Sequence, residues 1–153
     1  MPSNSANPDL PAAVNFDPTR AAIRLKLSLA GERNAVAPVV DSVLRMIGQE
    51  QCLEGKQDLL ELVLTEALAN AVEHGAKGDA SKVVHCEIAC DNAQGIFIAV
   101  RDPGTGYDPS KIANPVHEEN VLSEGGRGIF LITQLMDEVK FLNHGTEIQM
   151  VKR

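Results

Sequence analysis

Residues 61–75 read ELVLTEALANAVEHG, the centre of the longest helical pattern in the chain. The spacing predicts a helix over 58–74, and Gly75 is a natural C-terminal stop. Because apolar residues occupy nearly every side of this helix, we expect it to be buried. Glu66 and Asn70 lie one turn apart on one face, where buried polar groups need partners. The pair predicts a polar notch in an apolar wall; a solvated polar stripe is the alternative.

Periodicity places further elements on both sides of this helix. Alternating apolar residues predict strands, and a spacing of three to four predicts helices. The expected elements are a strand from 22 to about 29, a helix from about 36 to 48, strands at 83–89 and 96–100, a helix beginning near Ile129, and strands at 138–142 and 146–151. This order predicts an α+β fold, a two-layer sandwich in which a mixed, mainly antiparallel sheet carries about three helices on one face.

Length and composition limit the class of protein. With 153 residues the chain is most simply one domain. Residues 1–20 hold four of the eight prolines with several Asn and Ser residues, so we expect a flexible lead before a domain over 21–153. Cys52, Cys86 and Cys90 lack the spacing of a paired motif, which favours buried reduced thiols over a disulfide or a zinc site.

Charge and hydropathy restrict the partners. The chain has 14 basic and 21 acidic residues, a net charge of −7, so it would repel a nucleic-acid backbone. No apolar run approaches the roughly 18 residues of a spanning helix. The first residues, MPSNSANPDLP, lack the basic and apolar blocks of a signal peptide. We therefore expect a cytoplasmic protein with protein or small-molecule partners, no nucleic acid and no membrane.

A carboxylate follows the predicted strand 96–100. Alternation puts Asp102 on the same face as the core-facing residues of that strand. A charge there needs a donor, and the exocyclic amine of an adenine would supply one. Gly104 and Gly106 permit positive φ and let a planar ligand approach the backbone. The alternative is that DPGTG is an ordinary turn.

Three glycines gather before the last predicted helix. Gly125, Gly126 and Gly128 immediately precede the start near Ile129. Free backbone N–H groups and the helix dipole favour an anion there, so we expect phosphates at this point. Arg127 is placed to touch a terminal phosphate. A flexible linker with a solvated arginine is the alternative.

Together these segments resemble the GHKL ATP-binding fold of gyrase, the heat-shock chaperones, histidine kinases and mismatch-repair ATPases, and most of all the bacterial anti-sigma-factor serine kinases. The resemblance runs from about Ala22 to the C-terminus. Its elements are ELVLTEALANAVEHG for the N box, RDPGTGYD for the G1 box, GGRGIFLITQLMDEV for the G2 box and the pair Gly145-Thr146 near the adenine.

The resemblance implies a role for each matching residue. Glu66 would act as general base, Asn70 would ligate Mg²⁺, and Asp102 would accept a hydrogen bond from the adenine amine of ATP. The glycines with Arg127, and Thr146, would complete the nucleotide site. The resemblance also places His74 among the nucleotide-binding residues. We expect it to cap the C-terminal end of its helix, at the negative pole of the helix dipole, rather than to act in catalysis.

Function follows from the same resemblance. It implies a Mg²⁺- and ATP-dependent serine protein kinase that acts as an anti-sigma factor. Such a protein phosphorylates a STAS-type anti-anti-sigma partner, sequesters a sigma factor and commonly forms homodimers. Residues 107–124 would be a lid over the triphosphate. The alternatives are an ATP- or ADP-binding module that sequesters a partner without phosphotransfer, and a plain ATPase.

Overall fold

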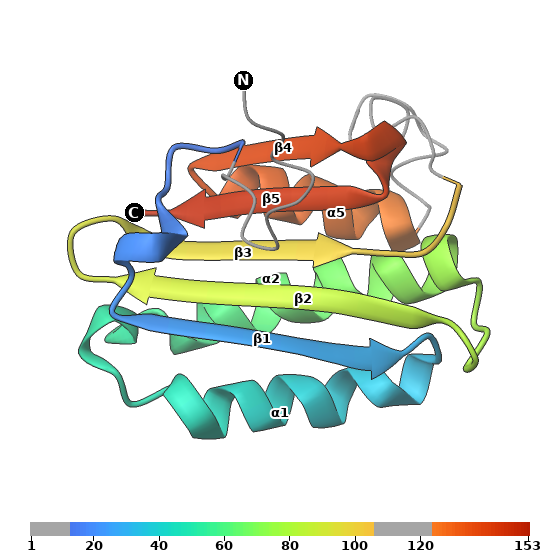
Figure 1. The fold of residues 1–153 in the computed structure, drawn as a ribbon, viewed down its shortest axis with the longest axis horizontal. Helices are drawn as coiled ribbons and strands as arrows, with labels where there is room; N and C mark the ends of the chain where they lie inside the picture. Colours follow the sequence, from blue (N-terminus) through green and yellow to red (C-terminus); the bar gives the residue numbers. More distant parts are fainter. Residues whose placement is uncertain (1–12, 106–123) are drawn as a thin grey trace.

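The computed structural model describes residues 13–105 and 124–153. Five strands and three longer helices follow one another within these described residues (Figure 1). They are β1 (Ile23–Ala30), α1 (Val36–Ile47), α2 (Gln57–Asn70), β2 (Val83–Asp91), β3 (Gly95–Arg101), α5 (Glu124–Leu135), β4 (Glu138–Leu142) and β5 (Glu147–Lys152). This is the order that periodicity predicts.

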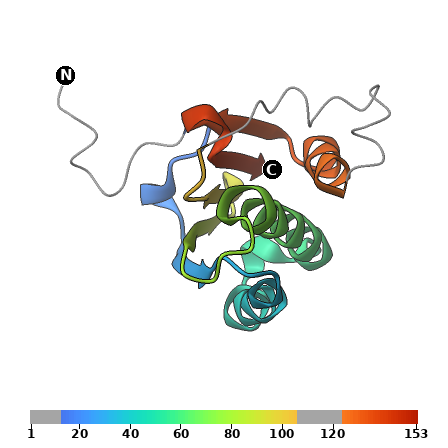
Figure 2. The same ribbon diagram turned by 90° about the vertical axis from the view of Figure 1, so that its right-hand side faces the viewer.

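The strands form a single sheet in the order β1-β2-β3-β5-β4. Every pairing among the described strands is antiparallel, with Ile98 of β3 opposite Ile88 of β2 and Met150 of β5. All three helices cover the same face of this sheet (Figure 2). The prediction of an α+β two-layer sandwich is confirmed.

The core lies between the sheet and the helices. The central strands and α2 supply many of its fully buried side chains, which include Leu60, Leu64, Leu68, Ile88, Ile98 and Met150. In α1 the buried face repeats at helical spacing, and Pro38 falls in the first turn, where its missing N–H removes no helical bond. No helix within 13–105 or 124–153 is both long and apolar enough to cross a lipid bilayer.

Residues 13–20 pack on the outer face of the sheet, so the expectation of a flexible lead is wrong for them. Val14 and Phe16 are buried, and the Phe16 ring stacks on Phe97 with 5.2 Å between centroids. The amide nitrogen of Asp17 donates to Gln94 Oε1 at 2.7 Å. Two apolar side chains and a few hydrogen bonds hold a segment whose composition alone predicts disorder. Residues 1–12 lie outside the described part.

The last helix begins at Glu124, not near Ile129 as predicted. Gly125, Gly126, Arg127 and Gly128 therefore lie within its first turns instead of in a preceding loop. Glycine is a poor helix former, which is why the sequence places the boundary later. Packing of α5 against α2 outweighs that preference.

The long central helix also extends past its predicted end. After Asn70 the backbone continues as a π-helical turn over Ala71–Ala76, which ends at Lys77 in the left-handed region with φ 55°. Gly75 therefore lies inside the turn and does not stop the helix. Turns of this type are frequent at functional sites because the extra residue redirects the side chains around it.

Cys52 and Cys90 form a disulfide, contrary to the expectation of three reduced thiols. Their Cα atoms are 5.9 Å apart although 38 residues separate them in sequence. Only Cys86 is a free, buried cysteine within the described residues. The folded topology brings the pair together, and no local spacing in the sequence could show it.

Candidate functional site

The first part of the candidate site lies where α2 and α5 pack together. Figure 1 shows the two helices running in opposite directions under the sheet. Gly128 of α5 is buried against Glu66 of α2, so closely that a Cβ at position 128 would overlap Glu66 Oε1. The glycine-rich segment and the predicted base are thus brought together, and the missing side chain of Gly128 leaves room for the carboxylate in this position.

Asn70 lies one helical turn after Glu66 at the end of α2. Its side chain is 8% exposed, and it is one of two buried polar residues in the described part of the chain. It adjoins the π-helical turn, where the backbone leaves regular α-helical geometry. An amide oxygen held in this position is a ligand type that Mg²⁺ accepts.

The second part of the site lies at the end of β3. The Asp102 amide nitrogen donates to the Thr146 carbonyl at 2.8 Å, and the Gly104 amide nitrogen donates to Asp102 Oδ1, also at 2.8 Å. Gly75 packs directly against the Asp102 carboxyl group, so closely that a Cβ at position 75 would overlap the carboxyl atoms. Asp102, Gly104 and Thr146 are therefore neighbours, as the sequence predicts.

The surroundings of Asp102 favour a hydrogen-bond donor. Burial raises the pKa of its carboxyl group above the usual value, while the Gly104 N–H and the charge of His74 act in the opposite direction. The burial effect is the largest of these. A ligand N–H that reached the carboxylate would favour its ionised form and offset the cost of burial.

The other predicted residues are placed less decisively. His74 and Arg127 are exposed, so the structure does not enclose either of them in a pocket. Gly125 and Gly126 belong to the first turn of α5. Gly106 and the expected lid, apart from its last residue, lie outside the described residues.

Sequence reasoning missed how tightly the π-helical turn is held. Gly31, after β1, contacts Ala76 so closely that a Cβ would overlap the Ala76 side chain. The guanidinium of Arg33 forms an ion pair with Glu73. Gly75 holds the opposite side of the turn against Asp102. The glycines beside the polar motif were the signal in the sequence. A glycine that ends a helix and a glycine that allows close packing of the backbone look the same there.

A hollow on the outer face of the sheet is separate from this site. Its lining includes Lys26, His85, Arg101 and Glu147, together with Pro18 of the N-terminal segment. None of the predicted site residues lines it. The contacts of Glu66 with Gly128 and of Asp102 with Gly75 lie instead on the helical side, along the last turns of α2 and the π-helical turn.

Comparison with known proteins agrees with this geometry. A family model described as a histidine kinase-like ATPase domain matches residues 29–152. The chain belongs to this family. The expected membership in the GHKL superfamily is confirmed. The match covers all three longer helices and every described strand, apart from the first part of β1.

Curated relatives carry two kinds of name. The chain is 33% identical to the serine-protein kinase RsbW of Bacillus subtilis (strain 168) over 100 residues, which is 61% of this chain and 62% of the relative. It is 36% identical to RsbW of Oceanobacillus iheyensis over 61% of this chain and 63% of the relative. It is 29% identical to the anti-sigma F factor of Bacillus cereus (strain AH187) over 61% and 66%. The chain spans just over three fifths of the length of the two kinases.

Proposed function

We propose that this histidine kinase-like ATPase domain is a Mg²⁺- and ATP-dependent serine protein kinase that acts as an anti-sigma factor. It phosphorylates a STAS-type anti-anti-sigma protein and sequesters a sigma factor when that protein is absent. In this proposal residues 21–153 are the kinase domain, the protein works in the cytoplasm, and homodimer formation accompanies partner binding. The names of the relatives support the kinase and anti-sigma roles.

The observation that carries the proposal is the contact between Glu66 and Gly128. It puts a partly buried carboxylate beside the first turns of a helix, where backbone N–H groups favour phosphate. Phosphoryl transfer depends mainly on positioning and charge neutralisation, so a carboxylate there can orient the attacking serine hydroxyl and accept its proton. A module that only holds nucleotide has no need of this base.

The remaining residues fit the binding of the nucleotide and its metal. The half-buried Asp102 carboxylate would accept from the adenine amine, beside Gly104 and Thr146. The buried Asn70 amide would hold Mg²⁺, and no cluster of three His, Cys, Asp or Glu side chains exists within 13–105 and 124–153 to hold a metal otherwise. When bound, Mg²⁺ supplies charge neutralisation at the phosphates. Arg127 and the α5 glycines would contact the phosphates, with His74 near the same end of α2.

The test uses γ-labelled ATP, Mg²⁺ and purified STAS-domain proteins from the same genome, with wild type and Glu66→Ala run in parallel. We expect label on a partner serine with wild type only. Calorimetry should find ATP bound by both proteins, which separates loss of chemistry from loss of binding. Tight binding without transfer to any partner would favour the sequestering module. Phosphate released to water at a rate that no partner changes would favour a plain ATPase.

A further inference from the structure

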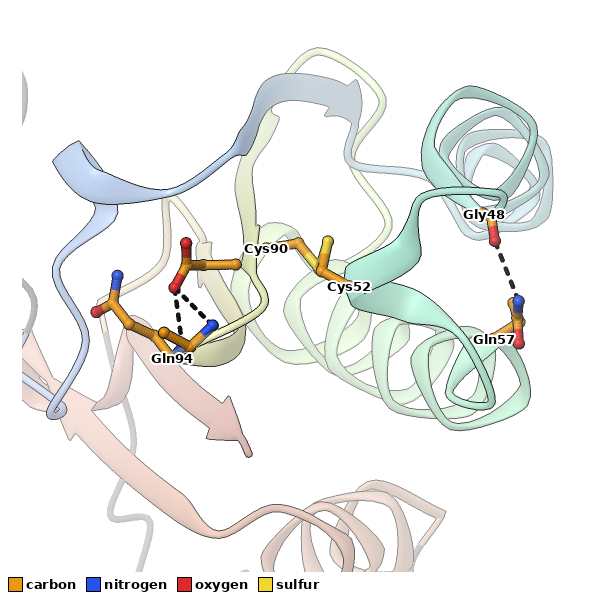
Figure 3. The surroundings of a disulfide bond; sticks show 7 residues. Gly48, Cys52, Gln57, Cys90 and Gln94 are labelled. Carbon is orange, nitrogen blue, oxygen red and sulfur yellow. Dashed lines mark hydrogen bonds between the residues drawn. A yellow bond between two sulfur atoms is a disulfide. The ribbon is translucent and has the colours of Figure 1, made fainter.

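The Cys52–Cys90 disulfide joins the helical layer to the sheet. Cys52 lies in the 3₁₀ turn Gln51–Leu53 between α1 and α2, and Cys90 is the penultimate residue of β2 (Figure 3). β2 and β3 run in opposite directions, so Cys90 and the candidate site at Asp102 lie at opposite ends of the sheet (Figure 1). The bond fixes the start of α2 and does not contact the site.

The two cysteines differ in their access to solvent. Cys90 is fully buried at 0% exposure, whereas Cys52 is only partly buried and packs at the margin of the core. A thiolate attacks a disulfide at the sulfur it can reach, and the other sulfur leaves. A reductant from solvent must therefore attack Cys52 Sγ, and Cys90 must be the leaving group.

The loop that carries Cys52 is held closed. The Gln57 Nε2 amide donates to the Gly48 carbonyl at 3.1 Å and bridges the ends of α1 and α2 (Figure 3). Leu53, next to Cys52, is fully buried. On the Cys90 side, Asp91 Oδ2 accepts from the amide nitrogen of Gln94 at 2.9 Å and fixes the hairpin after β2. Neither sulfur can move far unless loop 48–56 opens.

We propose that Cys52–Cys90 is a thiol–disulfide exchange site for a dithiol reductant and that opening of loop 48–56 limits its reaction. One thiolate of the reductant attacks Cys52 Sγ, the Sγ–Sγ bond breaks, and Cys90 Sγ takes up a proton. The second thiol of the reductant then displaces Cys52, which is released as a thiol. Two electrons and two protons pass to the protein, and the reductant becomes a disulfide.

The interior around Cys90 explains why opening is needed. Cys86 lies four residues earlier on the same face of β2, and burial raises the pKa of its thiol to about 12. A Cys90 thiolate released into these surroundings is disfavoured in the same way, which slows exchange in the closed protein. Opening the loop admits water and lets the leaving sulfur be protonated.

The experiment reduces the full chain with increasing dithiothreitol, stops the reaction with a maleimide of added mass, and counts modified thiols after denaturation. We expect one modified thiol before reduction and three afterwards. The reduction rate should reach a plateau as dithiothreitol increases, because loop opening becomes limiting. Gln57→Ala, which removes the bridge to Gly48, should raise that plateau about five- to tenfold, as loss of one hydrogen bond allows. Gln51→Ala, an exposed glutamine of the same loop, is the matched control and should leave it unchanged.

Other outcomes overturn the proposal. Three modified thiols in protein prepared without reductant and treated with oxidised glutathione would mean that no disulfide forms. A reduction rate that stays proportional to the dithiothreitol concentration, and is equal in wild type and Gln57→Ala, would mean that loop opening does not limit the reaction. Thermal melting gives a second readout: reduction should lower the melting temperature of wild type and Cys86→Ser but not that of Cys52→Ser. None of these measurements involves nucleotide, so they are independent of the proposed kinase activity.

Discussion

The two ends of α2 are built in opposite ways. At its start, a disulfide ties the loop after α1 to the sheet, a leucine of the loop is fully buried, and a hydrogen bond joins the ends of α1 and α2. At its far end, a π-helical turn lies between close-packed glycines, with a buried amide and a half-buried carboxylate beside it. One end of the helix therefore stabilises the fold, whereas the other end holds polar groups whose burial costs free energy. Changes at the two ends should therefore separate stability from ligand chemistry.

The largest effect is expected at the site end, from Glu66→Gln. The amide keeps the shape of the side chain against Gly128 but cannot accept a proton. We expect serine phosphorylation to fall by about 10²- to 10⁴-fold, the usual contribution of a general base. ATP affinity from calorimetry should stay within about twofold, since the base is needed for transfer and not for holding the nucleotide. An unchanged transfer rate would remove Glu66 from the chemistry.

At the opposite end, Leu53→Ala should lower the free energy of unfolding by about 2–5 kcal/mol, because it opens a cavity at a fully buried position. Denaturant titration measures the loss. Met46→Ala is a suitable control, since Met46 is 57% exposed and should change stability by less than about 0.5 kcal/mol. The comparison of the two ends requires unchanged ATP affinity in both variants, and a loss of affinity in Leu53→Ala alone would contradict it.

Asp102→Asn should move stability and binding in opposite directions. Because burial raises the pKa of Asp102, the folded state holds this proton more tightly than the unfolded chain does. Its ionisation therefore costs stability as the pH rises from the unfolded pKa through the folded one. The variant should be more stable than wild type at neutral pH, and this advantage should vanish in acid. Thermal melts from about pH 3, below the unfolded pKa of a carboxyl group, to pH 8 would show it.

The same substitution should weaken ATP binding by about 1.5–3 kcal/mol, the usual loss when a hydrogen bond to a charged acceptor is removed. Calorimetry at neutral pH measures this loss. Equal affinity in wild type and Asp102→Asn would mean that the adenine lies elsewhere, even if the stability change is observed.

A smaller effect is expected from Gly75→Ala. The added methyl would overlap the Asp102 carboxyl group, so the turn or the carboxylate must shift. Overpacking of this kind costs about 1–3 kcal/mol of stability. ATP affinity should fall with it, because Asp102 moves. If affinity is retained while stability drops, the glycine serves packing alone and the position of Asp102 tolerates displacement.

The sequence was informative wherever a regular period decided the outcome. Alternation placed β1 and the core-facing row that leads to Asp102, and helical spacing put Glu66 and Asn70 on one face. The sequence pattern does not predict contacts between elements that are distant along the chain. Nothing local reveals that Gly128 packs on Glu66, that Gly75 packs on Asp102, or that Cys52 meets Cys90 across 38 residues. These contacts depend on how separate elements approach one another, which a periodic pattern does not record.

The packing of residues 13–20 has a practical consequence for anyone who prepares this protein. A chain shortened to begin at residue 21, at the boundary that composition suggests, would leave the Phe97 ring and Val151 facing water without the cover of Phe16 and Val14. Exposed apolar surface of that kind promotes self-association. Expression designs, fusion tags and cleavage sites should therefore keep the chain from Ala13 onward, because the Ala13 amide nitrogen donates a hydrogen bond to Gln149 Oε1.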